Sequence, residues 1–193
     1  QKESIKFAES TVFEGMTSIR AIIKSYDLGI NDRQIKYILY DKDKMHKIAK
    51  EIGYFKAVSQ KYGFELLETS EDELEKLTLG TSHGGIVAIA GERTLPYLDD
   101  SFIESCGFYA MIQGIEDPYN FGYALRSLYA CGCNGIILPE RNWLTAAGVV
   151  ARSSAGASEM FKIAKSTPED AIGVFKRALK FWLFPKEKRN AKS

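Results

Sequence analysis

The segment EDPYNFGYALRSLYACGCNGIIL, residues 116–138, combines residue types that could bind an anion. An Asp-Pro pair opens it and favours a turn, because proline fixes its own φ and restrains its neighbour. Asn120 either caps the following helix or directs its amide into a crevice, and Gly122 allows another backbone to approach closely. Arg126 follows one turn later, near the positive end of the helix dipole. This arrangement favours a phosphate, but an ordinary capped helix with an exposed arginine explains the spacing equally well.

The elements around this segment alternate between helix and strand, which predicts an α/β fold. Apolar residues at helical spacing, or short runs of strand-forming residues, define the elements of the first half. Gly29 ends the first of these helices, and Ser70 with Glu73 forms a capping box for the last. The helices are predicted over 18–28, 43–62 and 71–78, and the strands over 35–40, 64–68 and 84–90. We expect helices on both faces of a small sheet.

The second half resumes the alternation after a stretch without a long period. Its strands are predicted over 107–114, 135–139, 161–165 and 179–184, and its helices over 120–132, 142–156 and 167–178. This order, β-α-β-α-β-α-β, is typical of a parallel Rossmann-like sheet, in which ligands bind at the carboxyl ends of strands. The absence of a G-x-G-x-x-G motif argues against a dinucleotide. If residue 184 ends the sheet, we expect its last strand to pair with another chain or to favour association.

We therefore divide the chain into a domain over 1–95, a linker over 96–106 and a second domain over 107–193. The apolar fraction of 45% suffices for a core, and the formal net charge of +1 requires any nucleic-acid site to be a local patch. No apolar run approaches the length of a membrane span. The three cysteines have no completed metal-ligand spacing, so we expect reduced thiols in a cytoplasm and no metal site.

The residues of the anion-binding segment also form a motif. DPYNFGYALRSLYACGCNGIIL resembles the first signature motif of the SpoU (TrmH) family of RNA ribose 2′-O-methyltransferases. The family pattern is Asp-Pro-x-Asn-x-Gly, an arginine six residues after the asparagine, then a glycine-containing turn and a strand. The matching residues are Asp117, Pro118, Asn120, Gly122 and Arg126.

Two further stretches carry the same resemblance, which covers roughly residues 5–178. ARSSAGASEM contains the Ser-Ala-Gly-Ala run of the family, which begins at Ser154. The first half resembles the family's L30e-like substrate-binding domain, including a His-x-Gly before its last strand, here His83, Gly84 and Gly85. The resemblance thus implies a small L30e-like α/β/α domain followed by a Rossmann-like SPOUT domain.

The resemblance implies an enzyme that methylates a ribose 2′-hydroxyl of rRNA or tRNA with S-adenosylmethionine, in a cytoplasmic homodimer without membrane or DNA partners. It implies catalytic roles for Arg126 and Asn120. We expect Arg126 to hold a phosphate and stabilise the developing alkoxide, and Asn120 to shape the loop and orient Arg126 or the ribose. The residues expected to bind substrate RNA are His83, Gly84, Arg152 and Ser154. By itself, a histidine such as His83 is more often a hydrogen-bonding loop residue.

Two later family motifs do not occur in this chain: a Gly-x-Glu-x-x-Gly loop and a final segment rich in Pro, Gly, Ser and Asn. They form the knotted cofactor pocket, so we expect a SPOUT domain truncated before the trefoil knot, with unknown cofactor-binding residues. We also expect the 193-residue polypeptide to have little or no methyltransferase activity. The alternatives are a non-catalytic RNA-binding protein derived from the family and, less favoured, an inert fragment.

Overall fold

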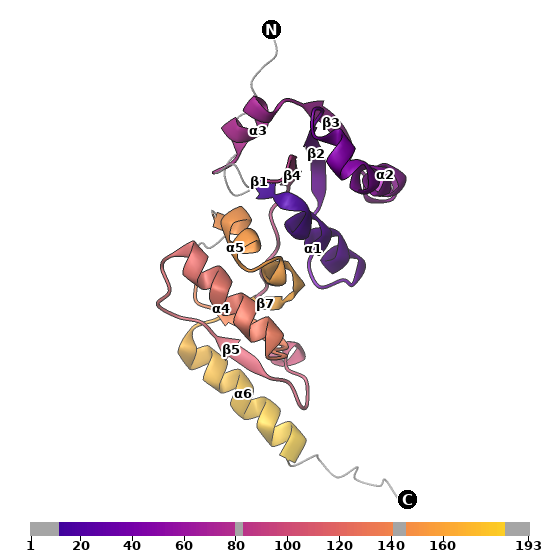
Figure 1. Cartoon of the computed structure of the whole chain (residues 1–193). Coiled ribbons are helices and arrows are strands. Elements are labelled where there is room, and N and C mark those ends of the chain that lie inside the picture. The colour runs from indigo at the N-terminus through magenta and orange to yellow at the C-terminus, as the bar shows by residue number, and fades with distance from the viewer. Residues whose placement is uncertain (1–11, 80–82, 141–145, 184–193) are drawn as a thin grey trace, which may run out of the picture.

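The computed structural model describes residues 12–79, 83–140 and 146–183, with side chains up to residue 179 (Figure 1). The elements of the first half are β1 (Val12–Glu14), α1 (Gly15–Asp27), β2 (Ile35–Asp41), α2 (Met45–Tyr62), β3 (Glu65–Thr69), α3 (Glu71–Leu77) and β4 (Ile86–Ala90). Its four-stranded sheet has the order β1-β4-β2-β3, with β2 and β3 parallel and β4 antiparallel to both of its neighbours. The predicted helices and strands of this half are confirmed.

The strand β1 was not predicted. It has only three residues, Val12–Glu14, and so offers too short a pattern to recognise. Val12 and Phe13 are nevertheless buried, because β1 pairs with β4 along the sheet edge.

Helices cover both faces of the first sheet, as expected. Alternate residues of β2 and β4 point to opposite faces. Ile38 and Ala88 belong to a buried core with residues of α1 and α2, whereas Val87 and Ile89 pack with Leu74 of α3 in a separate buried group. The two-sided core explains why β4 is buried along its whole length.

Two helices begin with the capping residues that the sequence predicts. Ser70 is the N-cap of α3, and its Oγ accepts a hydrogen bond from the backbone N of Glu73 at 3.4 Å. Thr167 Oγ1 accepts from the backbone N of Asp170 at 3.1 Å at the start of the last helix. Both ends therefore use the short hydroxyl side chains that the sequence predicts.

The second half contains η2 (Asp100–Phe102), β5 (Tyr109–Met111), α4 (Pro118–Ala130), β6 (Gly135–Leu138), α5 (Ala147–Ser153), η4 (Ala157–Met160), β7 (Lys162–Lys165) and α6 (Pro168–Leu183). Its sheet has the order β5-β6-β7 and is parallel throughout. Phe121, Leu125 and Val150 bring α4 and α5 onto one buried core with β6 and β7. The predicted helix over 142–156 is confirmed from 147 to 153; residues 142–145 lie outside the described part.

The fourth strand predicted over 179–184 is wrong. Residues 179–183 continue α6, which lies beside β5 at the lower end of Figure 1; residue 184 lies outside the described part. The aromatic residues there have strand propensity, but no glycine, proline or asparagine separates them from the helix before them. Ala171, Val174 and Ala178 are buried at helical spacing, so packing of one helix face outweighs local propensity. Residues 179–183 therefore do not form the edge strand that was expected to pair with another chain or to favour association.

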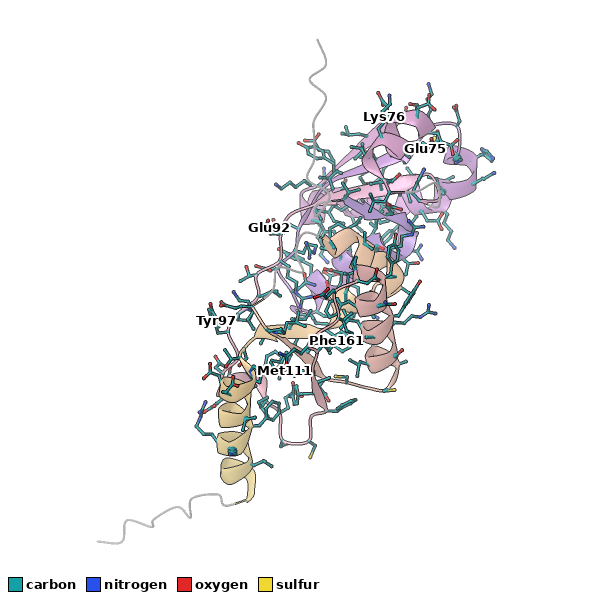
Figure 2. The ribbon with its side chains drawn as sticks, turned by 90° about the vertical axis from the view of Figure 1, so that its left-hand side faces the viewer. Glu75, Lys76, Glu92, Tyr97, Met111 and Phe161 are labelled. Carbon is teal, nitrogen blue, oxygen red and sulfur yellow. The ribbon has the colours of Figure 1, made fainter. Side chains whose placement is uncertain are left out.

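The segment between the halves is held along its length. Figure 2 shows Glu92 and Tyr97 along one side of the molecule, between the first half and the second. The backbone N of Leu98 donates to Lys165 O, and Lys165 N donates to Pro96 O, each at 2.8 Å. These bonds attach the segment to β7 of the second half. The division into domains at 95 and 107 remains a prediction.

A buried ion pair joins the two halves. Arg33 Nε lies 2.9 Å from Glu159 Oε2, and both side chains are only 3% exposed. Arg93 donates to the backbone oxygens of Ser158 and Phe161, and burial lowers the pKa of its guanidinium to about 10. The halves are therefore fixed to each other through η4. No helix within the described ranges is long and apolar enough to cross a membrane.

Candidate functional site

The start of α4 is built by Asp117 and Pro118. Asp117 is the N-cap, and its Oδ1 accepts from the backbone N of Asn120 at 2.8 Å. Pro118 occupies the first helical position, where its missing N–H costs nothing. The cap is thus the aspartate, and the Asn120 side chain is exposed on the first turn. This leaves the Asn120 amide available to a ligand outside the helix.

Gly122 sits where α4 meets α5. A Cβ atom at this position would lie 1.9 Å from Ser153 Oγ and 3.0 Å from the backbone N of Ser154. The close approach that the sequence predicts therefore takes place, and the partner is the end of α5. Arg126 lies four residues further on the same side of α4, beyond this contact.

Arg126 differs from the other arginines of the described ranges. It is exposed, and within those ranges the structure shows no hydrogen bond or ion pair for it. The other arginines there all have acidic or carbonyl partners: Arg20, Arg33, Arg93, Arg152 and Arg177. The Arg126 guanidinium can therefore meet an anion without breaking an internal bond.

Three of the predicted substrate-binding residues line one cavity of about 400 Å³. His83 and Gly84 come from the loop before β4, and Arg152 comes from the end of α5. Arg152 Nη1 bonds to Glu14 Oε2 at 2.6 Å, and its side chain remains 34% exposed. The cavity thus lies between the two halves of the chain, and its Arg152 guanidinium is already paired with a carboxylate.

His83 faces the interior and is 0% exposed. Its Nδ1 accepts a hydrogen bond from the backbone N of Gly85 at 3.1 Å. The bond belongs to the turn before β4, which fits the view of His83 as a loop hydrogen-bonding residue. A histidine in this position reaches a ligand only if the ligand enters the protein.

The structure separates Ser154 from these residues. Its side chain is 1% exposed, donates to Ala151 O at 3.2 Å and accepts from the backbone N of Ser158 at 3.1 Å. The hydroxyl therefore stabilises the turn after α5, and Ser154 is absent from the cavity lining. The pairing of Glu14 with Arg152 could not be predicted from the sequence, because the two residues are 138 positions apart.

Ala155 is strained beside the cavity. Its φ of +53° lies in the left-handed region that disfavours side chains with a Cβ. Gly156 follows with φ +83°, and a Cβ there would lie 2.7 Å from Ala21 Cβ in α1. The Ser-Ala-Gly-Ala run is thus shaped by the close packing of α1 against the turn after α5.

Replacing Ala155 with glycine should stabilise the protein. Glycine adopts positive φ without a steric penalty, and this gain exceeds its greater loss of chain entropy, so we expect about 0.5 kcal/mol. Urea unfolding of Ala155→Gly gives the difference. Gly156→Ala should change stability in the opposite direction, and equal effects of the two changes would contradict the assigned strain.

A cavity beside the second sheet is small. It has about 50 Å³ and is lined by residues that include Leu95, Leu138 and Ile163. A ligand of the size of S-adenosylmethionine needs several hundred cubic ångströms. These residues do not fit that cofactor, and we assign none of them to it.

Comparison with known proteins finds RNA methyltransferases of low sequence identity. No family model matches the chain. The chain is 29% identical over 113 residues to the 23S rRNA (guanosine-2′-O-)-methyltransferase RlmB of Bordetella pertussis, covering 57% of this chain and 46% of that protein. It is 28% identical over 115 residues to the putative TrmH family tRNA/rRNA methyltransferase YacO of Bacillus subtilis, with the same coverage. The chain spans about half the length of these relatives.

Solved structures share the fold. An rRNA methyltransferase from Sinorhizobium meliloti matches with a TM-score of 0.64 and 24% identity, over 88% of this chain and 60% of that one. An RNA 2′-O ribose methyltransferase matches with a TM-score of 0.65 and 22% identity, over 87% and 59%. These structures show that the chain shares the fold of RNA methyltransferases, and the sequence relatives support its resemblance to the SpoU (TrmH) family.

Proposed function

We propose that this chain is the RNA-binding and hydroxyl-activating portion of a SpoU-type RNA ribose 2′-O-methyltransferase. The observation that carries the proposal is the exposure of the Arg126 side chain on α4. Arg126 occupies the arginine position of the family motif. A motif arginine kept only for folding would be expected to have an internal partner, as Arg33 has.

The chemistry asked of this arginine is electrostatic. A ribose 2′-hydroxyl is a poor nucleophile until its proton leaves or its alkoxide is stabilised. A guanidinium remains protonated at neutral pH and so is a poor base. We infer that Arg126 holds an RNA phosphate and stabilises the alkoxide, and that the phosphate accepts the proton. Asn120, six residues earlier on α4, orients the ribose or Arg126.

The exposed face of α4 suits unpaired RNA. Tyr119 is 43% exposed and Tyr123 is 54% exposed, and they lie one turn apart on the way to Arg126. Aromatic rings stack on splayed bases, and a nearby cation binds the backbone. We propose an rRNA or tRNA loop as the substrate, since the similar proteins named above are described as rRNA or tRNA/rRNA methyltransferases.

The methyl donor of the proposed reaction is S-adenosylmethionine, which is bound in a similar Sinorhizobium meliloti structure. We further propose a homodimer in the cytoplasm. The three unpaired cysteines fit a reducing compartment. Sedimentation equilibrium tests the dimer, and a concentration-independent monomer mass would exclude it.

Replacing Arg126 with alanine should weaken RNA binding without unfolding the protein. Loss of one phosphate contact should reduce the slope of log affinity against log salt concentration by about 0.7 to 0.9. We expect the affinity to fall several-fold and the stability to change by less than about 0.5 kcal/mol, because Arg126 is exposed. Fluorescence anisotropy with a labelled single-stranded RNA over a salt series measures both quantities.

The matched control is Arg177→Ala. Arg177 is an equally charged, exposed arginine on α6, paired with Asp100. Its loss changes the net charge by the same amount but should leave the salt slope unchanged. Equal slopes for both variants would contradict the role of Arg126.

A non-catalytic RNA-binding protein is the second candidate, and the small cavity at the second sheet favours it. Calorimetric titration with S-adenosylmethionine separates the candidates. Saturable binding supports the enzyme, whereas retained RNA binding without cofactor binding supports the second candidate.

A further inference from the structure

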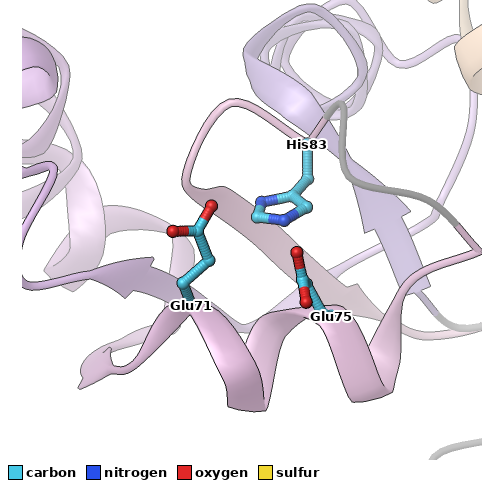
Figure 3. A group of neighbouring side chains, drawn as sticks. All are labelled: Glu71, Glu75 and His83. Carbon is cyan, nitrogen blue, oxygen red and sulfur yellow. The ribbon is translucent and has the colours of Figure 1, made fainter.

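A second group of side chains lies at the end of the first sheet. Glu71 and Glu75 are one turn apart on α3, and both point toward His83 (Figure 3). One potential ligand atom from each residue lies within 4.8 Å of the other two. We call these three residues the α3–His83 cluster. Its members come from two separate elements that the fold brings together.

The histidine of the cluster has a ring nitrogen without a hydrogen-bond partner in the described part of the chain. His83 Nε2 is buried and has no hydrogen-bond partner among the described residues. A buried polar atom without a partner is unfavourable, and such atoms are rare in folded proteins. In Figure 3 the ring lies between the two carboxylates, so this nitrogen is directed into the cluster. Nε2 can take a hydrogen-bond acceptor while it carries a proton, or a metal ion once the proton has moved to Nδ1.

The charge around the cluster is negative. α3 carries three acidic residues in its first turn, and Glu75 follows them. Asp41 at the end of β2 is 1% exposed, and its Oδ2 also lacks a hydrogen-bond partner in the described part of the chain. A cation beside these groups is Lys44, which bonds to Glu71 and lies 4.0 Å from Asp41 Oδ2. Its bond to Glu71 lowers the pKa of that carboxyl.

We propose that Glu71, Glu75 and His83 bind a divalent transition-metal cation, through two carboxylate oxygens and His83 Nε2. This donor set suits Zn²⁺ or Mn²⁺, whereas Ca²⁺ and Mg²⁺ prefer oxygen ligands alone. The two glutamates reach solvent, so water can complete the coordination shell. The proposal does not depend on the role proposed for Arg126.

Binding requires a rearrangement at Gly85. Because its N–H donates to His83 Nδ1, the neutral ring carries its proton on Nε2. A metal on Nε2 displaces that proton to Nδ1, and the Gly85 N–H must then turn away. Gly84 and Gly85 both have positive φ and lack a Cβ, so this segment can change its backbone angles. The Gly85 amide therefore reports on binding.

The test is titration of the full 193-residue protein with MnCl2, followed by electron paramagnetic resonance. Mn²⁺ is chosen because thiolates favour softer metals, which keeps the exposed Cys106 and Cys131 out of the readout. We expect one saturable site per chain. Glu75→Gln and His83→Ala should each weaken it at least tenfold. A failure to saturate in the unaltered protein would overturn the proposal.

Two further variants distinguish direct coordination of the metal from general electrostatic attraction by the acidic residues of α3. Asp72→Asn removes the same charge from α3 outside the cluster and should leave the affinity within about twofold. Lys44→Met frees Glu71 from its ammonium partner, so the affinity should rise several-fold. Equal losses for Asp72→Asn and Glu75→Gln would reduce the effect to nonspecific attraction and refute the site.

Nuclear magnetic resonance with ZnCl2 provides the structural readout. The ¹⁵N resonance of His83 Nε2 and the Gly85 amide should shift, while the exposed His46 should not. If His83→Ala fails to fold, Glu71→Gln and Glu75→Gln still decide the question, because both residues are exposed. Shifts at His46 with none at His83 would contradict the proposal.

Discussion

Glu159→Ala should lower the free energy of unfolding by about 3–5 kcal/mol. The substitution leaves the Arg33 guanidinium buried without its carboxylate, and an uncompensated buried charge is strongly destabilising. Glu159 also accepts from Asn31 Nδ2 at 3.3 Å, and its charge favours the protonated form of Arg93. Chemical denaturation with urea measures the loss, which is large against a usual total of about 5–15 kcal/mol.

Two comparisons make this result specific. Asp100→Ala breaks the ion pair with Arg177, whose two side chains are about 60% exposed, and should cost less than about 1 kcal/mol. The double variant Arg33→Met, Glu159→Met removes both charges and should recover most of the stability. A Glu159→Ala loss no larger than that of Asp100→Ala would show that the buried pair does not hold the halves together.

Gly122→Ala should lower the free energy of unfolding by about 3 kcal/mol. The new Cβ would lie 1.9 Å from Ser153 Oγ and 2.9 Å from Ser153 Cβ, so α4 and α5 must move apart. Forcing atoms into a packed contact costs about 1–3 kcal/mol or more. Because α4 also carries Arg126, we expect RNA affinity to fall with stability. Thermal unfolding and the anisotropy titration measure the two effects.

Gly173→Ala is the matched control on another helix. A Cβ at this position of α6 has Arg177 Nη1 at 3.6 Å as its nearest contact, which is an ordinary separation. Alanine favours helix, so this change should stabilise the protein by up to about 1 kcal/mol. The double variant Gly122→Ala, Ser153→Gly adds a Cβ on α4 and removes the Ser153 side chain that it would meet on α5. It should recover part of the loss in stability. A neutral effect of Gly122→Ala alone would refute the close contact.

The sequence by itself determined the elements whose signals are local. Helix α2 and strand β2 have clear periodicity, and the caps at Ser70 and Thr167 use side chains that bond within three residues. The family motif likewise lies within one continuous segment. Such features depend on neighbouring residues, so pattern and propensity are sufficient to predict them.

Local propensity failed where packing decides the outcome. The aromatic stretch after Ala178 has strand propensity, yet it continues α6 because the buried face of that helix begins at Ala171. In the same way, β1 exists because β4 offers it a partner. Neither result can be read from a short window, since the stabilising contacts lie elsewhere in the chain.

The candidate site shows the same division. Arg126 and Asn120 were predicted together, and both are exposed on α4. The tertiary structure alone decided that Arg152 pairs with Glu14, that the Ser154 hydroxyl is buried in a turn, and that His83 meets the carboxylates of α3. These partners are far apart in sequence or separated by a loop. Their meeting depends on how helices and sheets pack, because burial and charge pairing are properties of the folded chain as a whole.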